Sequence, residues 1–347
     1  MRAVCWAWVN FSWFSSAFDT DDWFFRVTTM VQMIGVLVLA LGLPAMFTSL
    51  AHGTGIDNSV MVAGYVVMRA AMVAQWLRAA QQDPDKRRIA VSYAVTIAVA
   101  QFGWVGLLFL HSLVIQIPVI VVVFAIEALG PLLSERKDGG TPWHAHHIAE
   151  RYGLLTIIAL GEGVVGTIAS VSAVVQRAGW SSEAILIVVA GTGLTFGLWW
   201  IYFTVPSAEV LERHRERALT WGYLHILLFA AITAVGAGLQ VAALVIEGRS
   251  KIGSLAAVAI VAVAVLLFVL ALFSIYALLL RTVDAFHVLL FAVVLALLGV
   301  ATALAWTGVP MGACLVVVTL APIAIVVGYE TVGYRHAGAA LTRVLGD

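Results

Sequence analysis

The chain has 347 residues, of which 62% are hydrophobic and only 11% are charged, and its mean hydropathy is +1.02. A soluble domain has about a quarter of its residues charged. The composition therefore excludes an ordinary soluble protein and predicts an all-α integral membrane protein that crosses the bilayer many times. The 19 basic and 19 acidic residues give a net charge of +0, so no nucleic-acid partner is indicated. The partner that the composition predicts is the lipid bilayer.

Apolar runs of about twenty residues, long enough to cross about 30 Å of hydrocarbon, predict about 11 transmembrane helices. The first, residues 3–18, is short. The other ten are residues 24–47, 60–80, 89–110, 113–133, 148–174, 184–205, 219–246, 253–280, 285–306 and 310–329. The first run is crowded with Trp and Phe, so we interpret it as part of a membrane helix and not as a cleaved leader.

Basic residues between these runs predict the orientation in the membrane, because Lys and Arg in short loops stay on the cytoplasmic side. Alternate loops and the C-terminal tail carry most of them: Arg78, Lys86, Arg87, Arg88, Arg136, Lys137, Arg213, Arg215, Arg217, Arg281, Arg335 and Arg343. The intervening loops hold only Arg177, Arg249 and Lys251. We therefore expect a multi-pass protein of the cell membrane whose C-terminus faces the cytoplasm.

Two stretches of the chain resemble each other and indicate a degenerate internal repeat. Residues 8–12 (Trp-Val-Asn-Phe-Ser) are similar to residues 200–204 (Trp-Ile-Tyr-Phe-Thr). In addition, the last span of each half ends with one glutamate near the cytoplasmic boundary, Glu127 in the first half and Glu330 in the second. The predicted arrangement is a parallel six-helix repeat. Residues 1–143 form its first copy with five spans, lacking the first helix of the repeat, and residues 144–347 form the second copy with six.

Three segments resemble the bacterial low temperature requirement protein A family: WAWVNFSWFSSAFDTDDWFFRVTTMVQMIGVLVLALGLP, YVVMRAAMVAQWLRAA and HHIAERYGLLTIIALGEGVVG. The resemblance covers most of the chain. It implies a further span ahead of Met1 with a Glu-Leu-Phe-Phe-Asp-type motif, which is the helix that the repeat also requires. The family is named for a growth phenotype in the cold, and the resemblance brings no reaction, substrate or cofactor.

The predicted helix at residues 148–174 carries charges in an otherwise apolar sequence. Glu150 and Arg151 lie in its first turn, and Glu162 lies about three turns further on, close to the same face as Arg151. A charged side chain in hydrocarbon is costly, so these residues are expected to face protein or a water-filled cavity. We expect this helix to line the pathway of a transported species.

A second intramembrane charge, Arg69, lies near the middle of the span at residues 60–80. Its depth matches that of Glu162, which predicts a buried Arg69–Glu162 ion pair. Such a pair is either a functional ionic site or a clamp between helices. Glu127, Glu330, Glu150 and Arg151 are predicted near the cytoplasmic boundary, where a lone charged side chain can extend to water.

The histidines offer two readings. His144, His146 and His147 lie close to Glu150, as first-row metal ligands can, but no second cluster completes a ligand set, so no metal site is predicted. Headgroup phosphates at the helix entry account for the same residues. His225 and His287 each lie inside an apolar span and are candidate proton shuttles, although a histidine in such a place is more often a core hydrogen-bonding group.

The sequence holds no phosphate-binding loop, nucleophile elbow or zinc-protease motif. It therefore favours a protein that is not an enzyme, with no cofactor, that moves a small solute or ion, such as a proton or cation, through the membrane by way of a buried charged site. A membrane-embedded enzyme acting on lipid, or a non-catalytic factor for tolerance of cold, stays open. The oligomeric state is also open.

Overall fold

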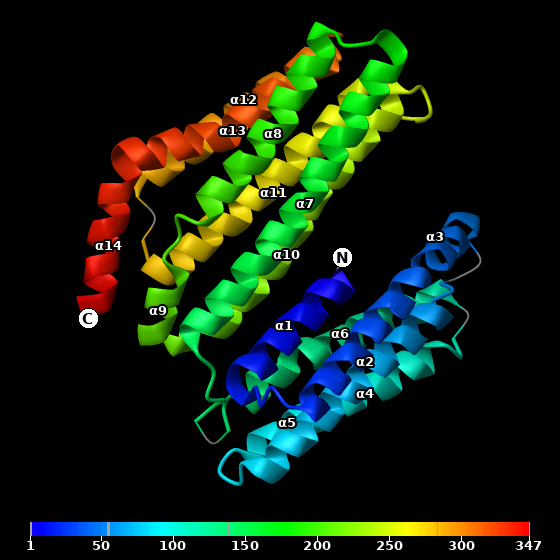
Figure 1. Ribbon diagram of the computed structural model, residues 1–347, viewed down its shortest axis with the longest axis vertical. Coiled ribbons are helices and arrows are strands. Elements are labelled where there is room, and N and C mark those ends of the chain that lie inside the picture. The colour runs from blue at the N-terminus through cyan, green and yellow to red at the C-terminus, as the bar shows by residue number, and fades with distance from the viewer. Residues whose placement is uncertain (1, 54–55, 111, 138, 283, 347) are drawn as a thin grey trace. The chain divides into compact units, whose positions relative to one another are not determined.

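The computed structural model describes residues 2–53, 56–110, 112–137, 139–282 and 284–346, and the side chains of Arg2 and Ala3 are outside the description. All regular elements in these ranges are helices (Figure 1). Ten helical stretches of this described part are long and apolar enough to cross a membrane. The predicted all-α, multi-pass architecture is thus confirmed.

The chain divides into two compact units, residues 10–144 and residues 1–9 with 145–347. The smaller unit holds most of α1 (Arg2–Phe18), together with α2 (Trp23–Leu41), α3 (Leu43–His52), α4 (Ser59–Gln82), α5 (Arg87–Leu107) and α6 (Leu113–Ser134). The larger unit contains α7 (Ala145–Ala178), α8 (Ser182–Tyr202), α9 (Ser207–Arg213), η1 (Arg215–Arg217), α10 (Ala218–Ile246), α11 (Ser254–Leu280), α12 (Ala285–Trp306), α13 (Met311–Gly328), η2 (Tyr329–Gly333) and α14 (Tyr334–Gly346).

The long helices lie where spans were predicted, although ten stretches of the described residues are long enough to span a membrane, against about 11 predicted, and α9, η1 and α14 lie outside the predicted spans. One predicted span is interrupted. The run predicted at residues 24–47 is two helices, α2 and α3, which are separated at Gly42. Pro44 lies in the first turn of α3 and has no N–H to continue the hydrogen bonds of α2, so the helix is interrupted there. The short first run is α1, with 17 residues.

The smaller unit is a bundle in which α2 packs along α4, α4 along α5, and α5 along α6. Glycines bring α2 and α4 into contact: a Cβ at Gly64 would lie 2.3 Å from the backbone N of Leu39, which no real side chain tolerates. Trp76, 1% exposed, forms the centre of the core and stacks on Tyr93 with ring centroids 4.1 Å apart.

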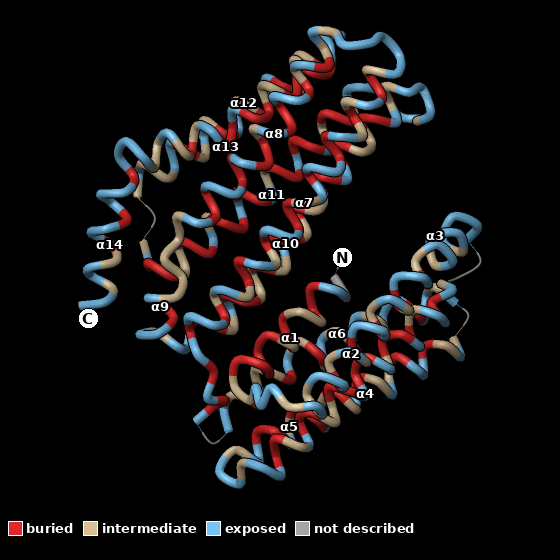
Figure 2. The backbone as a smooth tube through the Cα atoms, viewed as in Figure 1, coloured by how far each residue is buried: buried red, intermediate tan, exposed pale blue. Residues whose placement is uncertain are grey.

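The larger unit packs α7 and α11 along α10, α8 along α13, and α12 along α13. The contact between α7 and α10 again depends on glycine, because a Cβ at Gly166 would lie 2.5 Å from the carbonyl oxygen of Gly236. Buried positions run the full length of α10 and α11 (Figure 2), and on α11 they are almost all aliphatic or aromatic.

The order of neighbouring helices α2, α4, α5 and α6 in the smaller unit is matched by α10, α11, α12 and α13 in the larger one. Consecutive helical hairpins also produce this order, so the parallel repeat stays a prediction. The first nine residues belong to the larger unit, whereas the predicted repeat placed them with residues 10–143.

Large apolar side chains are exposed on the outside of both units. On α6 alone, Val114 is 81% exposed and Val121 is 61% exposed. Polar side chains such as Gln32, Gln75 and Glu127 are buried instead. An apolar exterior around a partly polar interior is the arrangement expected of helices that meet lipid.

Candidate functional site

An ion pair lies inside the smaller unit. Arg69 on α4 is 1% exposed and Glu127 on α6 is 6% exposed, and Nη2 of Arg69 is 3.9 Å from Oε1 of Glu127. Tyr65 connects them. Nη2 of Arg69 donates a 2.7 Å hydrogen bond to Oη of Tyr65, which in turn donates to the Glu127 carboxylate at 2.7 and 2.9 Å from its two oxygens.

The positions of Tyr65, Arg69 and Trp104 follow from their spacing along α4 and from the packing of α5 against it. Tyr65 precedes Arg69 by four residues and therefore lies on the same face of α4, so the guanidinium carbon is 4.9 Å from the centre of the Tyr65 ring. Trp104 of α5 packs edge-on against Tyr65, and its indole Nε1 lies 3.4 Å from Oε1 of Glu127. Three helices thus contribute to one site.

Pro131 affects the segment of α6 that carries the carboxylate. It lies inside the helix, four residues after Glu127. Proline has no backbone N–H, so the helical hydrogen bond to the carbonyl oxygen of Glu127 is missing. The helix nevertheless continues to Ser134.

Several polar atoms of this unit are buried without a partner among the described residues. They are Nε of Arg69, both side-chain amide atoms of Gln101 on α5, and the hydroxyls of Ser12 and Ser15 on α1. Trp76 stacks on Tyr93, and Tyr65 packs on Trp104, which fixes the antiparallel register of α4 and α5 and puts Gln101 at about the level of Arg69. The unpaired amide of Gln101 is therefore close in depth to the ion pair.

The same bundle has a second polar band nearer the Asp19–Asp22 loop. Gln32 on α2 donates to Gln75 on α4 at 2.8 Å, and Gln75 donates to Thr28 at 2.8 Å. Asp22 caps α2 by accepting from the N–H of Phe25, and it pairs with Arg78. The Arg78 hydrogen bond and then the Phe25 N–H hold the pKa of the Asp22 carboxyl well below its usual range.

The predicted partner of Arg69 was wrong: Glu127, not Glu162, is its counter-ion. Matched depth in two helices does not establish that they are neighbours, and Glu127 lies in the same unit. Glu127 itself was predicted to extend toward water, whereas it is buried and hydrogen-bonded. Glu162 is exposed on α7, with its backbone packed against Gly236.

The remaining predicted charges belong to the larger unit. Glu150 is exposed in the first turns of α7, and Arg151 is half-buried, with its carbonyl accepting from Nε1 of Trp8. Glu330 is exposed and accepts from Nε1 of Trp200 at 3.0 Å.

The histidine loop does not assemble a ligand set in the described ranges, where no group of three or more His, Cys, Asp or Glu residues could hold a metal ion. The backbone N–H of His144 donates to Ser16, and the exposed His146 pairs with Glu212 at 3.3 Å. His147 is exposed as well.

His225 is the polar centre of the larger unit and is 1% exposed. Its Nδ1 lies 2.8 Å from the carbonyl oxygen of Trp221, so Nδ1 carries the proton and Nε2 accepts from the hydroxyl of Tyr202 at 3.2 Å. Tyr202 and His225 line a hollow of about 320 Å³, together with Ser207 and Glu209. Both ring nitrogens of His225 thus have hydrogen-bonding partners, as in a core histidine, and its role as a proton shuttle stays a prediction.

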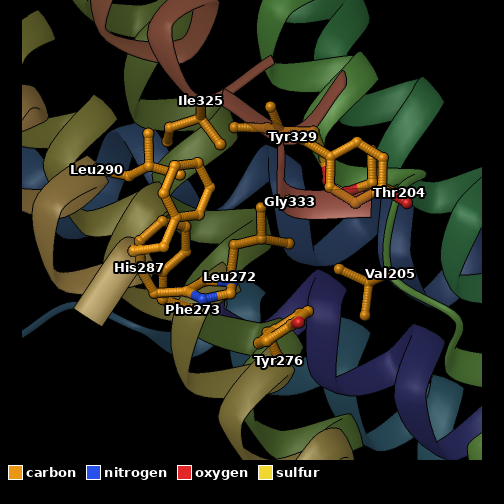
Figure 3. A pocket seen from close by; sticks show the side chains of 12 residues that line it. Thr204, Val205, Leu272, Phe273, Tyr276, His287, Leu290, Ile325, Tyr329 and Gly333 are labelled. Carbon is orange, nitrogen blue, oxygen red and sulfur yellow. The ribbon is translucent and has the colours of Figure 1, made fainter. Parts of the chain in front are cut away.

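His287 lies at a smaller pocket of about 40 Å³ (Figure 3), where its ring packs on Tyr276 at 4.4 Å. Its Nδ1 is 2.7 Å from one oxygen of Asp284, and Nδ1 of His336 on α14 is 2.9 Å from the other. Burial raises the pKa of Asp284, but hydrogen bonds from His287 and His336 outweigh it and lower that pKa to about 2.

Sequence reasoning missed Tyr65, Trp104, Asp284 and His336. Tyr65 had a usable signal, since a hydroxyl four residues before an intramembrane arginine can reach its guanidinium. Asp284 had one too, because an aspartate just before an apolar run is a typical helix N-cap, and it accepts from the N–H of His287. His336 joins Asp284 only through the tertiary fold.

Comparison with known proteins gives one family and one curated relative. The family model "Bacterial low temperature requirement A protein (LtrA)" matches residues 1–322. The uncharacterized protein RA0937 of Rhizobium meliloti (strain 1021) is 26% identical over 253 residues, which are 67% of this chain and 58% of that relative. The chain therefore matches less than two thirds of this relative's length. No solved structure matches the chain.

Proposed function

The chain belongs to the bacterial low temperature requirement A family, and we propose that it moves a small ion or solute across the bacterial cell membrane through the smaller unit. Arg69, Tyr65 and Glu127 form its ionic site. The C-terminus faces the cytoplasm in this proposal, in accord with the basic loops.

One observation carries the proposal: a complete ion pair is buried among helices whose outer surfaces are apolar. Withdrawing two charges from water costs several kcal/mol per ion, and apolar side chains of similar volume would pack at least as stably. A sequence that keeps such a pair inside a membrane bundle therefore points to a function for it, and ion or substrate pathways are the common case.

A structural clamp between α4 and α6 is the competing explanation. It predicts a protein that needs the pair for stability and passes nothing. The lipid-enzyme alternative relies on His147 and Glu150, both exposed, and no contact described above favours it.

The test is ion flux into liposomes containing the purified full chain, with gradients of H⁺, K⁺, Na⁺ and small anions applied in turn. We expect flux of at least one species that Glu127→Gln abolishes in protein that remains folded. Glu330→Gln is the matched control, because Glu330 is an exposed glutamate that belongs to the larger unit, and it should leave flux unchanged. Liposomes that stay tight to every species would refute the proposal.

Orientation has a separate test. Single cysteines at positions 87, 215 and 249, placed in a Cys-free background, report the side of each loop. A membrane-impermeant thiol reagent applied to intact cells should label position 249 alone. Labelling at 87 or 215 would reverse the topology.

A further inference from the structure

The guanidinium of Arg69 has more N–H donors than it has hydrogen-bond acceptors around it. A guanidinium offers five N–H groups, yet in the described structure Arg69 makes one hydrogen bond, to Tyr65, and its Nε is buried without a partner. Glu127 balances the charge from 3.9 Å, which is too far for a hydrogen bond. A buried charged donor left unpaired is costly, so the site is arranged to receive a further acceptor.

Gln101 independently indicates the same need. Its amide oxygen and nitrogen are both buried and unpartnered, and the register of α4 and α5 puts the residue at the level of Arg69. A polar ligand held beside the guanidinium would have a neutral donor and acceptor at the same depth.

The charge of the site selects the class of ligand. A fixed guanidinium repels cations, whereas its planar fork of donors matches the two oxygens of a carboxylate. One carboxylate, that of Glu127, already lies 3.9 Å from Nη2 of Arg69. A cation carried alone therefore fits this arrangement less well than an anion.

We propose that Arg69 binds a small carboxylate anion in place of Glu127, and that Glu127 takes up one proton when the anion displaces it. This inference rests on the proposed transport function and names its cargo. The anion forms hydrogen bonds to the guanidinium, the Glu127 carboxylate gains H⁺ from water, and no other bond changes. The charge of the site is the same before and after, so one proton accompanies each bound negative charge.

The groups that face Glu127 fit this exchange. Helix α4 contributes Tyr65 and Arg69, and α5 contributes the indole of Trp104. The indole does not gain or lose a proton at the pH values at which proteins are studied. A carboxylate that loses its guanidinium partner in an apolar interior is favoured in its neutral form. The Tyr65 hydroxyl, free to rotate, can donate to either carboxylate.

Ligand rescue tests binding without any transport. Removing the internal carboxylate by Glu127→Gln leaves Arg69 without a counter-ion, so an added carboxylate should stabilise this variant more than the wild type. Purified Glu127→Gln, Arg69→Gln and wild-type chains are heated in detergent with lactate, or with chloride at equal ionic strength. We expect lactate to raise the Tm of Glu127→Gln by several degrees, to raise that of the wild type less, and to leave Arg69→Gln unchanged.

Proton coupling is measured on the wild-type chain, so it does not depend on the folding of a variant. In weakly buffered liposomes, a lactate gradient should carry one proton per lactate, and the uptake should not respond to an imposed membrane potential. Empty liposomes correct for passive entry of lactic acid. Protonation of Glu127 should also appear as the carbonyl stretch of a carboxylic acid in lactate-induced infrared difference spectra.

The outcomes separate the anion site from the transport function. Equal stabilisation of all variants by lactate, an equal effect of chloride, or a response to inorganic phosphate but not to lactate would overturn the carboxylate site. Cation flux that needs Glu127, with no rescue by lactate, would keep transport and overturn the anion. Rescue and infrared change without flux of any species would keep the anion site and remove the transport function.

Discussion

The two units treat their buried polar groups differently. The smaller unit holds a full ion pair, Arg69 and Glu127, and Nε of Arg69 is buried without a partner. In the larger unit, the buried His225 has a hydrogen-bonding partner at each of its two ring nitrogens. Both units are bundles of long apolar helices, so composition does not distinguish them. Unpartnered buried polar atoms occur in both units, for example Nε of Arg217 and the hydroxyl of Tyr276 in the larger one. The difference is that the smaller unit buries a complete ion pair, whereas His225 has a hydrogen-bonding partner at each ring nitrogen.

The largest effect that this comparison predicts is on the ion pair itself. Glu127→Gln should lower the free energy of unfolding by about 3–5 kcal/mol, because it leaves a buried guanidinium that cannot lose its proton. Arg69→Gln should cost less, since a lone glutamate can become neutral. Unfolding in mixed detergent micelles measures both variants, and the Arg69→Gln/Glu127→Gln double variant should recover part of the loss. Strictly additive losses would show that the pair is not coupled.

A matched tyrosine exchange contrasts the two units directly. Tyr65→Phe removes a hydroxyl that bonds to two charged groups and should cost about 1.5–3 kcal/mol, whereas Tyr202→Phe removes one that bonds to neutral His225 and should cost about 0.5–1.5 kcal/mol. The same unfolding assay measures both. Equal costs would remove the distinction between a charged and a neutral polar centre.

The close glycine contacts between helices should contribute similarly to stability in the two units, whereas the buried polar groups should not. Gly64→Ala and Gly236→Ala each place a methyl group within 2.7 Å of a facing helix, and each should cost about 1–3 kcal/mol. Gly161→Ala is the control, because nothing lies within 4 Å of its Cβ position, and it should be neutral or stabilising by up to about 1 kcal/mol. A loss at Gly161 as large as that at Gly64 would argue against these helix contacts.

The smallest effect concerns α14 in the larger unit. The folded-state pKa of Asp284 is lowered to about 2, so its stabilising contacts are complete above the ordinary value near 3.8 and are lost as the pH falls from there to about 2. At neutral pH, Asp284→Asn should weaken the bond to His336 and speed amide hydrogen exchange in residues 334–346, with little change in overall stability. Unchanged exchange there would mean that other contacts hold α14.

Periodicity and length were sufficient to predict most of the fold. The spans were found because hydrophobic runs have to match the bilayer, whereas the interruption at Gly42 and Pro44 and the short helices α9 and α14 were overlooked. The site was harder. Arg69 was identified because an intramembrane arginine is rare, but its partner was not, since depth along a helix can be counted from the sequence while the facing helix cannot. Glu127 was therefore assigned to the membrane boundary and Glu162 to the pair.

The missing hydrogen bond in α6 bears on how the carboxylate could turn. Because Pro131 removes the donor for the carbonyl oxygen of Glu127, this carbonyl group is held by one helical hydrogen bond fewer than the carbonyl groups in a regular turn. The helix is therefore more compliant at the residue that carries the negative charge than in a turn with all its hydrogen bonds, and its remaining turns can stay packed against α5. A change of ionic partner then requires the motion of one peptide and one side chain, on the timescale of a local fluctuation and without the displacement of a whole helix.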